Sequence, residues 1–163
     1  MPSILTAIET TSFELLDTLD QVPAAQFLLS PPDGGWSPAQ IAEHLLKSET
    51  NITRLLKHGQ TVPTQRPADE HVKAIEGIFL DFDAKYETAA AIQPSDMPLK
   101  KEIVCKALQV NREDLLKIAE FTDLTLTYTD RKFPGLGTLT GLEWATVLVT
   151  HYQRHIRQLK NIT

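Results

Sequence analysis

Three histidines have the residue type and spacing that could bind a metal ion. His151 and His155 are four residues apart in a segment with helical periodicity. If successive residues are stepped by 100°, His155 lies about 40° from His151, and both share a face with Trp144 and Leu148. A pair of histidines one helical turn apart can bring two imidazoles to the same ion. The spacing therefore predicts that this face supplies two ligands of a metal site.

A third histidine lies on the apolar face of another predicted helix. His44 is flanked by Ile41 and Leu45. A buried imidazole needs a hydrogen-bond partner or a metal, because an unsatisfied polar group in the core costs about 1–3 kcal/mol. A single core histidine is usually structural, a pair makes the two interpretations about equal, and a third inward histidine favours a metal. Zn, Ni and Fe all accept imidazole ligands, and a site with three protein ligands leaves a coordination position open.

Several side chains near the histidines in sequence could support the site. Gln158 lies about −20° and Arg154 about −60° from His151 on the helical wheel. Arg154 could meet an anionic group at the mouth of a pocket, although a solvated surface arginine is the commoner case. Trp144 and Trp36 could be pocket walls, with core anchors as the simpler account. Glu43 adjoins the first histidine, but the wheel turns it about 100° away.

The remaining histidines and the cysteine carry weaker signals. His58 lies at a predicted helix end and His71 at the start of a polar segment, so exposed or capping roles are expected. Cys105 has no neighbouring histidine in sequence and is expected to be a small buried residue. The serines and threonines show no nucleophile motif, so the catalytic residues stay unassigned.

The apolar periodicity predicts the helices that would position these groups. Ser37, Pro38 and Gln40 form a helix start with a capping box, and Gly59 ends that helix. Thr140 and Glu143 form a second capping box before a helix that runs to about residue 162. Further helices are expected over 3–20 and 99–120. A weaker helical pattern over 70–91 is interrupted by Gly77 and an Asp-Phe-Asp run. The breakers predict a loop over 60–69 and a turn over 132–137. The alternating residues predict an extended segment over 124–129.

Length and composition limit the class of protein. The chain has 163 residues, of which 42% are hydrophobic and 23% charged, so one helical-bundle domain over 1–163 is expected. The net charge of −5 and the absence of a basic cluster argue against nucleic acid as a partner. No secretory signal or membrane-length apolar run is present, and one cysteine allows no intrachain disulfide. A cytoplasmic location is expected.

Two sequence motifs resemble those of the DinB/YfiT-like superfamily. One is the segment Trp36 to Leu45, similar to W-S-x-x-x-[IL]-x-x-H-[LI]. The other comprises the Gly-Leu-Gly-Thr turn, Thr140, Glu143-Trp144 and the H-x-x-x-H pair followed by Gln158. The resemblance extends from Trp36 to Gln158 and implies an all-α fold, a four-helix bundle with an unusual connection order, often assembled as a homodimer. It also implies that the three metal ligands are His44, His151 and His155.

The resemblance implies more than one class of function. Members are similar to metal-dependent transferases that use low-molecular-weight thiols, to maleylpyruvate isomerases and to hydrolases. A thiol transferase or a hydrolase acting on a small molecule is therefore one hypothesis. The other is a non-catalytic metal or small-molecule binder whose site is structural or vestigial. An open pocket of a few hundred Å3 at the metal would favour the enzyme, and a closed, dry site would favour the binder.

Overall fold

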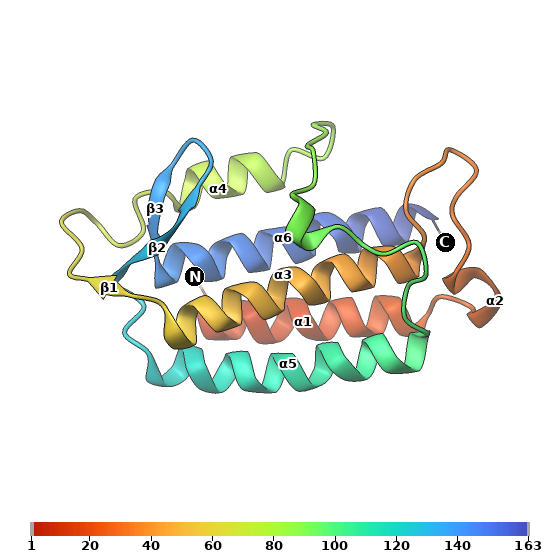
Figure 1. Cartoon of the computed structure of the whole chain (residues 1–163), viewed down its shortest axis with the longest axis horizontal. Coiled ribbons are helices and arrows are strands. Elements are labelled where there is room, and N and C mark those ends of the chain that lie inside the picture. The colour runs from red at the N-terminus through yellow and green to blue at the C-terminus, as the bar shows by residue number, and fades with distance from the viewer. Residues whose placement is uncertain (1, 163) are drawn as a thin grey trace.

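Four long helices form the body of the molecule. The structure is a computed structural model that describes residues 2–162. The long helices are α1 (Ile4–Asp20), α3 (Pro38–His58), α5 (Lys101–Phe121) and α6 (Gly141–Ile162) (Figure 1). Shorter elements lie between them: α2 (Ala24–Phe27), β1 (Thr61–Val62), α4 (Val72–Phe79), the 3-10 helix η1 (Ala90–Ile92), β2 (Thr127–Phe133) and β3 (Gly137–Thr140). The fold is thus the expected all-helical bundle, with a small sheet added at one end.

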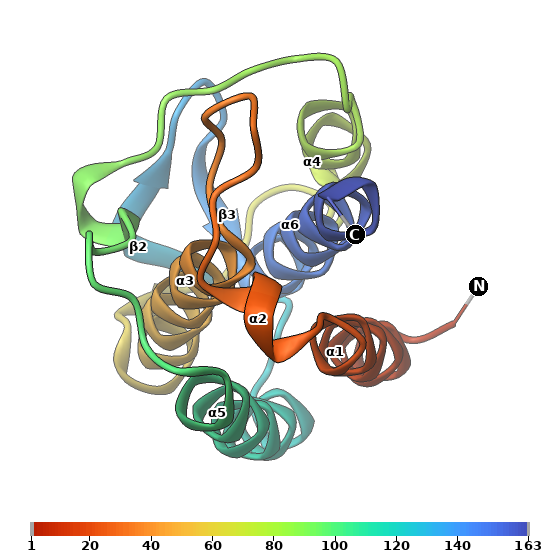
Figure 2. The ribbon, with the colours of Figure 1, turned by 90° about the vertical axis from the view of Figure 1, so that its right-hand side faces the viewer.

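The long helices occupy the corners of a square when the bundle is viewed along its axis (Figure 2). Helix α6 packs against α1 and α3, and α5 packs against the same two helices from the other side. Helices α1 and α6 run in one direction and α3 and α5 in the other (Figure 1). The long connection from α3 to α5 makes this order possible, and it carries α4 across α6 and η1 against α3.

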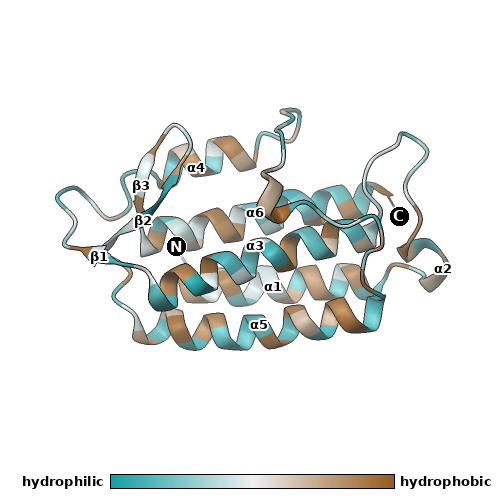
Figure 3. Ribbon diagram, in the orientation of Figure 1, coloured by the Kyte–Doolittle hydropathy of each residue, from teal (hydrophilic) through white to brown (hydrophobic). Residues whose placement is uncertain are grey.

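The core comes from the amphipathic pattern of the four helices. Brown and teal residues alternate along each of them in Figure 3. Burying one leucine or isoleucine contributes roughly 1.5–3 kcal/mol, so a layer of such side chains from all four helices stabilises the bundle. Fully buried examples from α1, α3, α5 and α6 are Leu15, Leu45, Leu115 and Leu148.

Both predicted capping boxes are present. At α3, the Gln40 N–H donates to Ser37 Oγ (3.2 Å) and the Ser37 N–H donates to Gln40 Oε1 (3.0 Å). At α6, the Glu143 N–H donates to Thr140 Oγ1 (3.1 Å) and the Thr140 N–H donates to Glu143 Oε2 (2.9 Å). These caps set where the two histidine-bearing helices begin, and therefore fix their register.

The 70–91 pattern does not form one helix. Helix α4 ends at Phe79, and the chain then turns around Asp81, whose Oδ1 accepts the N–H groups of Asp83 (3.2 Å) and Ala84 (3.3 Å). An aspartate that binds nearby backbone N–H groups competes with helix formation. The interruption expected from the Asp-Phe-Asp run is therefore confirmed, and its cause is a local side-chain turn. The interruption expected at Gly77 was wrong, because Gly77 lies inside α4.

The extended segment lies further along the chain than predicted. Leu124 and Thr125 belong to a turn closed by Asp123, and β2 begins only at Thr127. Strand β2 pairs with β3 through the predicted glycine turn, where Gly135 and Gly137 have φ values of 81° and 77°. It also pairs with β1, which lies within the predicted 60–69 loop. The partner strand was missed because two residues are too few to show an alternating pattern.

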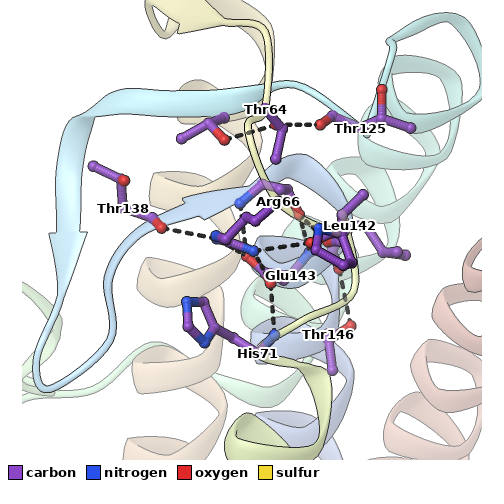
Figure 4. A network of polar contacts seen from close by, with 12 residues as sticks. Thr64, Arg66, His71, Thr125, Thr138, Leu142, Glu143 and Thr146 are labelled. Atoms are coloured by element: carbon purple, nitrogen blue, oxygen red, sulfur yellow. Dashed lines mark hydrogen bonds and ion pairs between the residues drawn. The ribbon is translucent and has the colours of Figure 1, made fainter.

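An ion pair between the half-buried Arg66 and the fully buried Glu143 fixes the loop before α4. The two guanidinium nitrogens of Arg66 donate to the two carboxylate oxygens of Glu143, both at 2.7 Å (Figure 4). Glu143 also accepts the backbone N–H of His71 (2.8 Å), and its side chain is 0% exposed. The pair ties the start of α4 to the start of α6. Within the described range of residues, no helix is long and apolar enough to cross a membrane.

Candidate metal centre

The three predicted histidines meet between α3 and α6. The Nε2 atom of His151 lies 2.8 Å from Nε2 of His44 and 3.1 Å from Nε2 of His155. One potential ligand atom from each ring lies within 4.8 Å of the other two. The side chains are 3%, 8% and 7% exposed for His44, His151 and His155. The wheels therefore predicted the right faces, and the bundle brings those faces together.

The outer nitrogens of two rings fix their tautomers. His44 Nδ1 lies 2.8 Å from the carbonyl oxygen of Ile92, and a carbonyl can only accept, so Nδ1 carries the proton. His155 Nδ1 lies 2.7 Å from Gln158 Oε1 and donates to it in the same way. A neutral imidazole has one N–H, so the Nε2 atoms of both rings present lone pairs.

This arrangement suits a cation better than a hydrogen-bond network. His151 Nε2 faces two lone pairs and can donate one proton to one of them, which leaves the other nitrogen pair in repulsion. In a tetrahedral site with ~2.05 Å metal–nitrogen bonds, ligand nitrogens lie ~3.3 Å apart. The two separations that include His151, 2.8 and 3.1 Å, are close to that value, and all three ligand atoms lie within 4.8 Å of one another. The donor set therefore could hold a divalent ion.

The electrostatics keep all three rings neutral. Burial lowers the pKa of His44 below its ordinary value and lowers that of His151 well below it. Burial and the neighbouring His44 lower the pKa of His155 to about 3, against the raising effect of Gln158. Neutral rings can bind a metal without first losing a proton.

Aromatic rings cover the histidines. The ring of Trp36 lies 4.9 Å from that of His44 and 6.4 Å from that of His155, measured between centroids. The ring of Phe79, at the end of α4, lies 5.4 Å from that of His151. The sequence favours a core anchor as the simpler role of Trp36, and it does not predict that Phe79 or the Ile92 carbonyl lies at the site. Of these three groups, only Trp36 could have been placed near the site from the sequence, because it directly precedes the start of the His44 helix.

The other predicted site residues have distinct placements. Gln158 contacts His155 directly. Arg154 donates to the carbonyl oxygens of Phe79 (3.2 Å), Asp81 (2.7 Å) and Ala84, so it holds the chain after α4. Trp144 lies two turns before His151 and packs against Phe133, with ring centroids 6.2 Å apart. Of these three residues, only Gln158 forms a hydrogen bond with one of the three clustered histidines.

The other two histidines and the cysteine that the sequence analysis considered lie outside the three-histidine cluster. His58 is exposed at the end of α3, and His71 precedes α4 without a side-chain capping bond. Cys105 is half-buried on α5, and burial raises the pKa of its thiol, which disfavours the thiolate. A hollow of about 570 Å3 on α5 and one of about 240 Å3 between α3 and α5 contain none of the three clustered histidines among their lining residues, although His58 lines the smaller one.

Comparisons with known proteins agree with this fold. The model of the DinB superfamily matches residues 7–159. The crystal structure of TT2238, a four-helix bundle protein, superposes with a TM-score of 0.60 at 20% sequence identity, covering 96% of this chain and 94% of that one. No curated protein matches the sequence. Because the family model spans nearly the whole chain, this protein belongs to the DinB superfamily.

Proposed function

We propose that the protein binds one divalent metal ion through His44, His151 and His155. The observation that supports this most strongly is the convergence of three Nε2 atoms, two of which have their lone pairs aimed inward by bonds at Nδ1. Zn, Ni and Fe suit an imidazole donor set. The function of the site would then follow from the charge and the open position of the ion.

We further propose a metal-dependent enzyme, either a transferase of a low-molecular-weight thiol or a hydrolase acting on a small molecule. A divalent ion held by three neutral ligands supplies Lewis acidity that lowers the pKa of a thiol or water at the open position. The chain's contribution is to present the three lone pairs and to exclude bulk water with the Trp36 and Phe79 rings. The choice between thiol transfer and hydrolysis rests on family resemblance. The expected homodimer and cytoplasmic location stay predictions.

Cobalt substitution tests this proposal directly. We expect Co²⁺ to bind in equimolar amount and to give visible bands of a four- or five-coordinate site. Addition of a low-molecular-weight thiol then produces a new sulfur-to-cobalt band if the open position accepts thiolate. Unchanged bands with a panel of such thiols would contradict the transferase. Absence of Co²⁺ and Zn²⁺ binding would contradict the metal site itself.

The second candidate is a non-catalytic metal binder. It is favoured by the low exposure of the three rings, of which none exceeds 8%. A substrate would have to displace part of the cover formed by Trp36, Phe79 and the chain after α4. Access of a thiol to bound Co²⁺ therefore separates the two candidates: a spectral response supports the enzyme, and an inert, saturated spectrum supports the binder.

A further inference from the structure

One face of α3 holds the segment 92–95 over the histidine cluster. The His44 ring donates to the carbonyl oxygen of Ile92 (2.8 Å), and Lys47 Nζ donates to that of Gln93 (2.7 Å). Gln40 Nε2 lies 3.5 Å from the carbonyl oxygen of Ser95. Three side chains spaced along one face of α3 thus reach three backbone carbonyls, those of Ile92, Gln93 and Ser95, in a segment about fifty residues away.

Glu43 makes the strongest set of contacts with this segment. Its carboxylate accepts the N–H of Ser95 at Oε1 (3.0 Å) and the hydroxyl of Ser95 at Oε2 (3.2 Å). Lys47 Nζ lies 3.1 Å from the same Oε1. Glu43 is 6% exposed, so its two contacts with Ser95 are largely shielded from water.

We propose that Glu43 is a positioning residue of the metal centre. By anchoring Ser95, it places the Ile92 carbonyl against His44 Nδ1 and so fixes the ligand tautomer. Its effect on metal binding rests on the proposed function, while its effect on the tautomer does not. Glu43 thus acts through a remote segment, although the wheel turns it away from the cluster.

The neighbouring ligand provides an internal comparison. His155 is oriented by Gln158, three residues ahead on the same helix, and needs no remote segment. Loss of the Glu43 contacts should therefore release the His44 ring and leave the His155 ring as it is. A general loss of structure would affect both rings.

Nitrogen NMR of the imidazoles in metal-free protein tests the tautomer. We expect wild type to show His44 protonated at Nδ1. In Glu43→Ala the His44 signals shift towards a mixture of tautomers, whereas His155 keeps the Nδ1 tautomer that Gln158 sets. Glu43→Gln keeps acceptor and donor groups for Ser95 and should retain the wild-type pattern. Glu14→Ala, which removes an exposed partner of Lys160, is the matched control and should also leave both rings unchanged. An unaltered His44 tautomer in Glu43→Ala would overturn the proposal.

Zn²⁺ affinity, measured by competition with a chromogenic chelator, tests the consequence. Loss of a group that orients a ligand typically costs 10–100-fold in affinity, so we expect a loss of about that size in Glu43→Ala. Glu43→Gln should stay within about fivefold of wild type, because Lys47 is 38% exposed and ion pairs of that kind contribute little. In a His44→Ala background, Glu43→Ala should have no further effect. Equal losses with and without His44 would overturn the proposal.

Two outcomes keep this proposal separate from the function itself. If wild type binds none of Zn²⁺, Ni²⁺ and Fe²⁺, the proposed function fails, and the NMR measurement still decides the role of Glu43. If Glu43→Ala does not fold, Lys47→Met serves instead, because it removes the bond from Lys47 to the Gln93 carbonyl that also holds the segment 92–95 against α3. A smaller shift of His44 in the same direction then supports the proposal, and no shift overturns it.

Discussion

The Tyr152 hydroxyl donates a hydrogen bond to the carboxyl group of Glu49 inside the bundle. Glu49 is 1% exposed, and its Oε1 has no hydrogen-bond partner among the described residues. Burial raises the pKa of this carboxyl to about 8, against the opposing charge of Arg112. The residue directly after His151 is therefore bonded to a carboxyl group that is largely protonated at neutral pH.

This carboxyl should make the protein less stable as pH rises. The folded state binds the Glu49 proton more tightly than the unfolded state, whose pKa is near 4.5. The stabilisation is complete below that value and is lost as pH rises through about 8. We expect the unfolding free energy of Glu49→Gln, relative to wild type, to gain about 2 kcal/mol between pH 6 and pH 8. Urea denaturation at both pH values measures it. Parallel pH profiles for the two proteins would contradict a buried, protonated Glu49, and Glu14→Gln is the exposed control.

The histidine cluster should give the opposite pH dependence. The folded pKa values are lowered, so below the ordinary pKa of 6.5 the unfolded chain binds protons that the folded, metal-free protein does not. Stability is then lost as pH falls from 6.5 towards the folded value of about 3 for His155, at up to about 1.4 kcal/mol per pH unit for each ring. Denaturation of chelator-treated protein from pH 7 to 5 should show this slope, and His155→Asn should reduce it. Burial also moves proton competition for the metal below the pH 6.5 expected of an exposed histidine.

The Arg66–Glu143 ion pair should contribute more to the free energy of unfolding than the exposed ion pairs do. Arg66→Met leaves the Glu143 carboxylate buried without its counter-charge, which typically costs about 3–5 kcal/mol. The remaining N–H donors of His71 and Thr140 place the expected loss near the lower end, about 3 kcal/mol. Thermal or urea unfolding measures the change. Lys160→Met, which breaks an exposed pair with Glu14, should cost no more than about 1 kcal/mol. Similar losses of unfolding free energy in both variants would contradict a larger contribution from the Arg66–Glu143 pair.

Trp36 should report metal binding by fluorescence. The chain has two tryptophans. Trp36 lies against the rings of His44 and His155, whereas Trp144 lies seven residues before His151, about 10 Å along the helix. Ni²⁺ and Co²⁺ quench nearby indoles at short range. We expect Trp144→Phe, which keeps Trp36, to lose most of its emission on Ni²⁺ addition. Trp36→Phe should lose much less. Stronger quenching of Trp144 would place the ion elsewhere.

Local sequence patterns were sufficient to predict the main helices and the three histidines. The capping boxes at Ser37 and Thr140 set the register of α3 and α6, and the 100° step per residue then selected the faces of His44, His151 and His155. Those signals are local, because a cap and a periodic stripe depend on residues within a few turns. The three histidines then meet because the bundle packs the apolar faces of α3 and α6 against each other.

The surroundings of the site could not be predicted in the same way. The Ile92 carbonyl and the Phe79 ring belong to the connection between α3 and α5, which has no sustained periodicity. Arg154 lies at the expected angle, but its partners are carbonyls after α4 that no helical wheel includes. Glu43 was judged by its direction on the wheel, while its function depends on Ser95, far along the chain. Each of these depends on contacts between distant segments.

Metal content tests the central claim most directly. Protein purified without added metal and without a histidine tag is analysed for elements beside His151→Ala, with reconstitution by Zn²⁺, Ni²⁺ or Fe²⁺ where needed. We expect about one divalent ion per chain in wild type, on the usual stoichiometry of a three-ligand site, and its loss in the variant. No bound ion in wild type after reconstitution, or equal metal content in both proteins, would contradict a metal centre at His44, His151 and His155.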